Sequence, residues 1–235
     1  MIWQQFFHLV GAIQFFYGCY YDQKYVNVPH VSKTYAAFGG KLKYLTYLDA
    51  IIQTIYFIVA FLNDLIGTNE PNPPEKPLIR RIKDTLFTCL AFPLAMFVGL
   101  SFWGIYSIDR ELILPRAMDA YFPTWLNHVM HTNIALFVLI EMFASFRMYP
   151  SRKSGLTLLV VFMLSYLVWL HTIYFYSGYW VYPILEILNW PLKVFFFLFC
   201  LILVSGLYFT GEYLNKTAWE SQIDATRKSW KKKAK

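Results

Sequence analysis

Polar side chains are rare within the apolar stretches of this sequence, and the few that occur limit the chemistry open to it. Thr46, Asp49 and Gln53 are spaced at i, i+3 and i+7, which places them on one face of a helix. A later apolar stretch opens with Asn127, His128 and His131. A hydroxyl and an imidazole at matched depth can perform acyl transfer, because the imidazole removes the hydroxyl proton and the alkoxide attacks an ester carbonyl. Thr46 and His131 are therefore the candidate nucleophile and general base.

Each of these residues also has a purely structural interpretation. A threonine in a membrane helix commonly bonds its own i−4 carbonyl or a neighbouring helix, and His131 near a helix start can face headgroup water. Asp49 and Gln53 fit packing contacts or support for the site. His171 lies in an aromatic stretch and fits a packing role, and Glu141 beside Arg147 is interpreted as structural.

Metal and cofactor chemistry fit the sequence less well. His128 and His131 are at i, i+3, a spacing from which two imidazoles can share a metal, but there is no HExxH motif and no second histidine pair nearby. The GxSxG, Rossmann and P-loop patterns are absent as well. Cys19, Cys89 and Cys200 all lie in apolar segments, which favours buried free thiols. The sequence therefore predicts neither a metal nor a cofactor.

Composition sets the environment in which these residues must work. Of the 235 residues, 57% are hydrophobic, 20% are aromatic and only 15% are charged, whereas a soluble domain has about 25% charged residues. Such hydrophobicity excludes intrinsic disorder, and three cysteines exclude a disulfide scaffold. The composition predicts a polytopic membrane protein.

Segments long enough to cross a bilayer as helices number about six. A crossing helix needs about 20 mainly apolar residues, because backbone groups in lipid must bond to each other. We predict an all-α polytopic membrane protein, a single membrane domain over residues 1–235 with an intramembrane site. The expected helices are 2–21, 45–66, 85–108, 128–147, 156–176 and 191–214, followed by a basic cytosolic tail over 215–235.

Basic residues predict the orientation. If both termini are cytosolic, 14 of the 21 lysines and arginines fall on the cytosolic side, as the positive-inside rule requires. The starts of helices 45–66 and 128–147 then share the opposite side, so Thr46 and His131 can lie at similar depth. Beside so apolar a chain, the basic tail fits anionic membrane lipids rather than nucleic acid. The final Lys232-Lys233-Ala234-Lys235 has the dilysine pattern of endoplasmic-reticulum retrieval. We therefore expect the endoplasmic reticulum, with the plasma membrane as the alternative.

Several strings, taken in order, resemble those of one membrane family. The most specific is the run from Trp125 to Thr132, with its two histidines. The others are Lys43-Tyr44-Leu45-Thr46 followed by Asp49 and Gln53, Leu90-Ala91-Phe92-Pro93, Asp109-Arg110-Glu111, Tyr121-Phe122-Pro123, Tyr149-Pro150-Ser151, Ser154-Gly155-Leu156-Thr157, Trp180-Val181-Tyr182-Pro183, and Gly211-Glu212 with Leu214-Asn215. Over roughly residues 20–220 the chain resembles the androgen-induced and androgen-dependent TFPI-regulating membrane proteins.

This resemblance implies a multi-pass membrane hydrolase that cleaves fatty acid esters of hydroxy fatty acids (FAHFAs). The family's threonine nucleophile falls on Thr46 and its histidine on His131, and His128 remains a possible orienting group. The implied partners are a lipid ester drawn from the bilayer and the membrane lipids themselves. Two other functions stay open, namely a non-enzymatic membrane regulator or adaptor, and a lipid-binding or transport protein.

Overall fold

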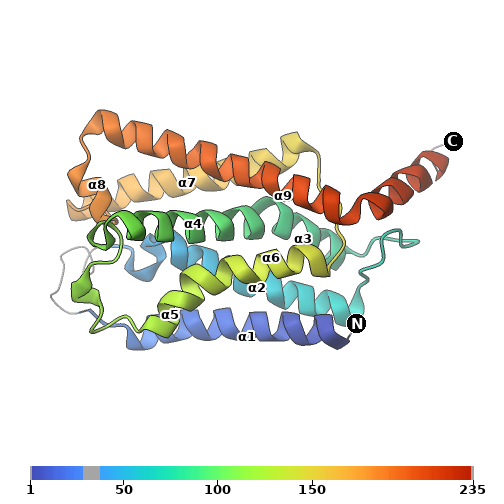
Figure 1. The fold of residues 1–235 in the computed structure, drawn as a ribbon, viewed down its shortest axis with the longest axis horizontal. Coiled ribbons are helices and arrows are strands. Elements are labelled where there is room, and N and C mark those ends of the chain that lie inside the picture. The colour runs from blue at the N-terminus through green and yellow to red at the C-terminus, as the bar shows by residue number, and fades with distance from the viewer. Residues whose placement is uncertain (1, 29–37, 234–235) are drawn as a thin grey trace.

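The computed structural model describes residues 2–28 and 38–233, and every regular element within them is helical. The long helices run side by side along one axis of the molecule, with α4 between the pair α7 and α9 and the group α1, α2 and α6 (Figure 1). The α-helices are α1 (Ile2–Tyr25), α2 (Leu45–Ile66), α3 (Leu78–Leu86), α4 (Phe92–Ile108), α5 (Thr124–His128), α6 (Ile134–Ala144), α7 (Arg152–Ser177), α8 (Pro183–Ile187) and α9 (Trp190–Lys233).

Five helical stretches of the described chain are long and apolar enough to cross a membrane. They are Leu45–Ile66, Leu78–Ile108, Thr124–Ala144, Arg152–Ser177 and Trp190–Ser229. The sixth predicted crossing, α1, is long enough at 24 residues but is less apolar than these five. It packs along α2 and exposes large apolar side chains, among them Phe6, Ile13 and Phe16, on its outer side. An outward apolar face of this kind suits contact with lipid.

Several predicted helix ends were wrong. The third crossing begins at Leu78 rather than 85 and the fourth at Thr124 rather than 128, because Pro77 and Pro123 supply the extended residue that precedes each helix. The last helix continues through the predicted tail to Lys233, with one non-helical residue at Trp219. The side chains become more polar from residue 215 onward, but the helix continues. Ala234 and Lys235, which complete the dilysine pattern, lie outside the described residues.

Both termini lie at one end of the bundle, and the candidate site lies toward the other (Figure 1). The Pro-rich segment 67–77 is at the terminal end, where the Thr226 hydroxyl of α9 donates to the Pro71 carbonyl. The segment after α6 is there too, since the Asn215 amide donates to the Arg147 carbonyl. The three basic segments therefore gather at one end of the bundle.

A buried polar network ties α1, α2 and α6 together away from the site. The two ring nitrogens of His8 lie 2.6 Å from Asp64 and 2.9 Å from Glu141. Glu141 also accepts from Tyr56 at 2.5 Å and pairs with Arg147 at 2.8 Å. Charged groups inside such a bundle are tolerated only when they are paired. The contact with Arg147 agrees with the structural role predicted for Glu141.

Candidate active site

Thr46 is the second residue of α2, and the start of that helix is held from outside. The backbone N–H of Leu45 faces the hydroxyls of Tyr166 and Tyr182, each at 3.0 Å. The Tyr166 hydroxyl also donates to the Lys43 carbonyl at 2.9 Å. The first N–H groups of a helix lack intrahelical acceptors, so these tyrosines satisfy one of them and fix the depth of Thr46.

His131 lies in a π-helical turn, Val129–Asn133, between α5 and α6. A π turn bonds i to i+5 instead of i+4, and such turns recur at functional sites. Here the ring Nδ1 of His131 reaches back to Asn127, lying 2.7 Å from its side-chain Oδ1 and 3.0 Å from its carbonyl oxygen. The ring of Phe102 stacks on the imidazole, with centroids 3.5 Å apart and an angle of 12° between the planes. Backbone, amide and aromatic contacts together fix the ring.

A glycine allows α4 to approach this turn closely. A Cβ atom at Gly99 would lie 3.0 Å from the carbonyl oxygen of His131 and 3.2 Å from the Cβ of Ala135. Those distances are tighter than ordinary van der Waals contact. The absence of a side chain therefore brings α4, and with it Phe102, against the His131 turn.

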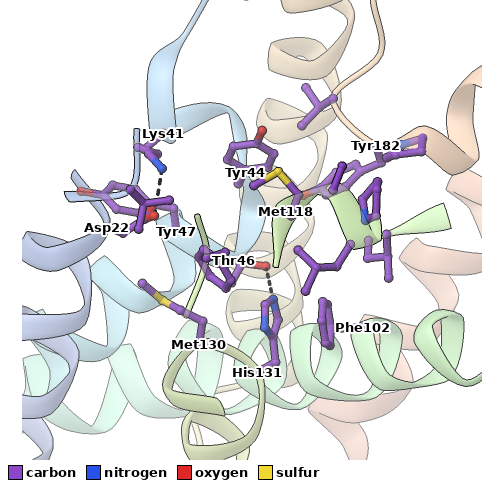
Figure 2. A pocket seen from close by; sticks show the side chains of 18 residues that line it. Asp22, Lys41, Tyr44, Thr46, Tyr47, Phe102, Met118, Met130, His131 and Tyr182 are labelled. Atoms are coloured by element: carbon purple, nitrogen blue, oxygen red, sulfur yellow. Dashed lines mark hydrogen bonds and ion pairs between the residues drawn. The ribbon is translucent and has the colours of Figure 1, made fainter. Parts of the chain in front are cut away.

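The two candidate residues meet. Thr46 Oγ1 lies 3.3 Å from His131 Nε2, as the dashed line in Figure 2 shows. Both groups near Nδ1 are acceptors, so Nδ1 carries the proton of the neutral imidazole and Nε2 is left as an acceptor. The Thr46 hydroxyl therefore donates toward Nε2. This is the arrangement that general-base activation of a hydroxyl requires, with an Asn–His–Thr order of contacts.

Two cavities adjoin Thr46. The smaller, of about 200 Å³, contains His131 and also Asp22 and Lys41 in its lining. The larger, of about 680 Å³, is almost wholly apolar and lies between α4, α7, α8 and α9. Four residues line both cavities, Thr46, Phe102, Ile113 and Tyr182. The candidate nucleophile thus lies where a small cavity with a few polar side chains adjoins a larger, almost wholly apolar one.

The larger cavity opens on the side of the bundle. Leu100, Leu164 and Leu198 belong to its lining, yet 51%, 46% and 54% of their surfaces are exposed. An opening between apolar, half-exposed side chains faces the hydrocarbon region when the bundle is in a bilayer. The lining of this cavity is therefore continuous with the apolar outer surface of the bundle.

Among the described residues, Lys41 is the cation that lines the small cavity. Its ammonium lies 2.9 Å from Asp22, an ion pair marked by a dashed line in Figure 2. Lys43 is buried and is absent from both linings, and burial together with nearby Lys41 lowers the pKa of Lys43 to about 8. Arg110 pairs with Asp119 and lines neither cavity.

Other polar residues singled out from the sequence have different surroundings. Asp49 accepts from Gln53, whose amide also donates to the Ala91 carbonyl, so this pair joins α2 to the π-helical turn Phe87–Ala91. His128 is exposed, stacks on Trp103 and bonds Thr132, and within the described residues no hydrogen bond or ring contact joins it to His131. His171 bonds its own i−4 carbonyl and lies among aromatic rings, and it also lines the large cavity.

Two polar residues near the Thr46–His131 pair, Asn127 and Tyr182, were not predicted from the sequence to lie there. Asn127 is four residues before His131, a spacing that places both on one helical face and offers a usable signal. Tyr182 is distant in sequence and reaches Leu45 only through the fold, so no local pattern could reveal it. Within the described ranges no group of three or more histidine, cysteine or acidic side chains is arranged to hold a metal ion.

Comparison with known proteins gives one consistent result. Residues 3–216 match the family model described as "FAR-17a/AIG1-like protein". The Androgen-induced gene 1 protein of Homo sapiens is 39% identical over 86% of this chain and 85% of its own length. The Androgen-dependent TFPI-regulating protein is 42% identical in Mesocricetus auratus, over 82% of this chain and 83% of its own. Its Homo sapiens counterpart is 37% identical over 77% and 78%. No solved structure matches the chain.

Proposed function

The chain belongs to the FAR-17a/AIG1-like family of membrane proteins, and we propose that it is an intramembrane lipid-ester hydrolase in which Thr46 is the nucleophile and His131 the general base. One observation carries the proposal. The Thr46 hydroxyl lies 3.3 Å from the unprotonated nitrogen of an imidazole whose other nitrogen is held by Asn127. This pair stands beside a cavity that is open to lipid.

The reaction has two steps, both served by the same imidazole. First the Thr46 oxygen bonds to the ester carbonyl carbon while its proton passes to His131 Nε2, and the carbonyl electron pair moves onto oxygen. The intermediate collapses with cleavage of the ester C–O bond, and the departing alkoxide takes the proton from Nε2. Water then attacks the acyl-Thr46 ester with His131 again as base, which releases a carboxylic acid and regenerates Thr46.

The substrate class we propose is the FAHFA, an ester with two long chains and one free carboxylate. A volume of 680 Å³ is within the range of ligand sites, and the apolar lining suits an acyl chain. The smaller cavity, which holds Lys41, suits the chain that ends in the carboxylate, because the ammonium can pair with it in place of Asp22. The ester then lies between the two cavities, beside Thr46.

The proposed address is the endoplasmic-reticulum membrane, with both termini in the cytosol. The gathering of basic segments at the terminal end supports this orientation. The catalytic pair then lies toward the lumenal side, and its partners are the lipid ester and the surrounding lipids.

The test is covalent labelling by a fluorophosphonate in lipid nanodiscs, together with FAHFA hydrolysis. Thr46→Ala should abolish both, and Thr46→Ser should retain both because the hydroxyl is kept. The matched control is Thr54→Ala, which removes a buried threonine of the same helix whose hydroxyl donates to the Ala50 carbonyl and also contacts the Cys19 thiol. Thr54 is eight residues further on, about 12 Å along the helix.

The outcomes separate the three functions. Loss of labelling and hydrolysis in Thr46→Ala and His131→Ala, with Thr54→Ala unchanged, supports the hydrolase. Stoichiometric FAHFA binding with neither labelling nor turnover in the unaltered protein would favour a lipid-binding or transport protein. Absence of binding, labelling and turnover would favour the regulator or adaptor.

A further inference from the structure

The proposed reaction produces a negative charge that Thr46 and His131 cannot stabilise. Attack of Thr46 moves an electron pair onto the carbonyl oxygen, and hydrolases stabilise that oxyanion with hydrogen-bond donors placed in advance. The imidazole becomes cationic, but its Nε2 proton points at the hydroxyl and leaving-group oxygens. A separate donor must therefore face the ester carbonyl.

Tyr182 is the other polar residue at the junction of the two cavities. Of the four residues that line both, Phe102 and Ile113 have no polar side-chain atom, and Thr46 is the nucleophile. Tyr182 reaches this position from the segment between α7 and α8, and its side chain extends into the pocket that holds the Thr46–His131 pair (Figure 2). An ester bound across the junction therefore lies against the Tyr182 side chain.

Hydrogen-bond accounting leaves the Tyr182 proton available. The Leu45 N–H faces the Tyr182 oxygen at 3.0 Å, so that oxygen acts as an acceptor there. The single proton of Tyr166 goes to the Lys43 carbonyl at 2.9 Å. Tyr182 then directs its own proton either to the Tyr166 oxygen, 2.9 Å away, or to a ligand. A bound ester carbonyl needs only a rotation about the Tyr182 C–O bond to receive it.

The start of α2 also favours negative charge at the ester carbonyl oxygen. The positive end of a helix dipole is at its first turn, and Thr46 is the second residue of a 22-residue helix. No backbone or side-chain acceptor within the described residues takes the Thr46 N–H. Burial raises the pKa of Tyr182, so its hydroxyl remains a neutral donor throughout the working pH range.

We propose that Tyr182 is a catalytic residue, donating a hydrogen bond to the ester carbonyl oxygen as it becomes an oxyanion on attack by Thr46. The proton stays on Tyr182 throughout; only the Thr46 proton is transferred, to His131. This inference rests on the proposed hydrolase and adds the oxyanion donor to it. It also gives the Tyr182-Pro183 string, far from Thr46 in sequence, a role at the reacting centre.

The test compares Tyr182→Phe with Tyr166→Phe. Tyr182→Phe keeps the ring, and the Leu45 N–H retains its bond to the Tyr166 hydroxyl. Removal of one oxyanion donor costs about 10²–10³-fold in kcat, so we expect that loss with KM nearly unchanged. Tyr166→Phe removes the neighbouring hydroxyl of the same cluster and reports the structural cost alone. We expect a loss of less than about tenfold in kcat, because the Tyr166 hydroxyl bonds Leu45, Lys43 and Tyr182 and none of these contacts is made to the ester.

A second readout uses a lipid trifluoromethyl ketone, which adds the Thr46 oxygen reversibly and leaves an oxyanion. Its inhibition constant should rise about 10²–10³-fold in Tyr182→Phe, in step with kcat, because it mimics the transition state. Equal losses in the two tyrosine variants, or a change confined to KM, would overturn the inference.

The remaining outcomes are separable. If Thr46→Ala still hydrolyses FAHFAs, the proposed function itself is wrong. If Thr46→Ala is inactive while Tyr182→Phe keeps wild-type kcat and ketone affinity, the function stands and the role of Tyr182 falls. Should Tyr182→Phe not fold, a ¹³C-carbonyl ester bound to Thr46→Ala replaces it. The carbonyl stretch should shift to lower frequency than in vesicles, and an unshifted band would refute the donor.

Discussion

Replacement of Asn127 by Ala measures how the general base is held. Nδ1 of His131 has two acceptors on one residue, the amide oxygen at 2.7 Å and the backbone carbonyl at 3.0 Å. Asn127→Ala removes the first and keeps the second. The imidazole therefore still has an acceptor for its Nδ1 proton, so the reactive tautomer persists with one hydrogen bond fewer.

The magnitude follows from that difference. One net hydrogen bond contributes about 1 kcal/mol, which corresponds to about a fivefold fall in kcat. Loss of the correct tautomer would lower kcat far more, by about 10⁴-fold in a serine protease in which the wrong tautomer was imposed. The assay is FAHFA hydrolysis in nanodiscs under saturating substrate. The matched control is His128→Ala, one residue along. The exposed His128 ring contacts Trp103 and Thr132, so its removal should lower kcat by less than Asn127→Ala does.

Two results would refute this reasoning. A loss in Asn127→Ala as complete as that in Thr46→Ala would mean that the amide alone sets the tautomer and the backbone carbonyl does not serve. A loss in His128→Ala equal to that in His131→Ala would reopen which histidine is the base.

Four further predictions follow from the geometry. Lys41→Gln should raise KM for FAHFAs with kcat nearly unchanged, and should not affect neutral esters, since Lys41 is placed to meet only the carboxylate. Cys200→Phe, which fills part of the larger cavity, should shift preference in a competition assay toward shorter chains. Arg147→Met should cost about 3–5 kcal/mol in unfolding measurements because it breaks a fully buried pair. Arg152→Met breaks a pair with Glu212 in which the Arg152 side chain is 69% exposed, and it should cost less than about 1 kcal/mol. The single sequon at Asn215 should carry no glycan by glycosidase shift, because its side chain is buried on Arg147 and the proposed topology keeps it cytosolic.

The glycosidase result also bears on orientation. A glycan on Asn215 would invert the proposed topology and place the catalytic end in the cytosol. Relocalisation after Lys232 and Lys233 are changed to Ser would support the retrieval signal, and unchanged residence would remove that signal while leaving the topology in place.

The sequence predicted the membrane class and the helical architecture, and together with the family strings it singled out Thr46 and His131 as a candidate pair. Apolar length and the cost of unbonded backbone in lipid leave helices as the available solution for this chain, so composition was enough. The depth of Thr46 and His131 followed from their places near two helix starts on one side. Helix ends were less predictable, because α9 continues past 214, where only the side chains change character and the backbone has no reason to stop.

Tertiary structure decided what surrounds that pair. The π turn at Val129–Asn133 aims Nδ1 of His131 at Asn127, and no sequence pattern marks where a helix takes up an extra residue. The two cavities form between helices that are distant in the chain, and Tyr182 reaches the start of α2 across 137 residues. Local sequence sets which side chains a helix presents at a given depth. The partner that each one meets depends on how the helices pack, which is a property of the whole chain.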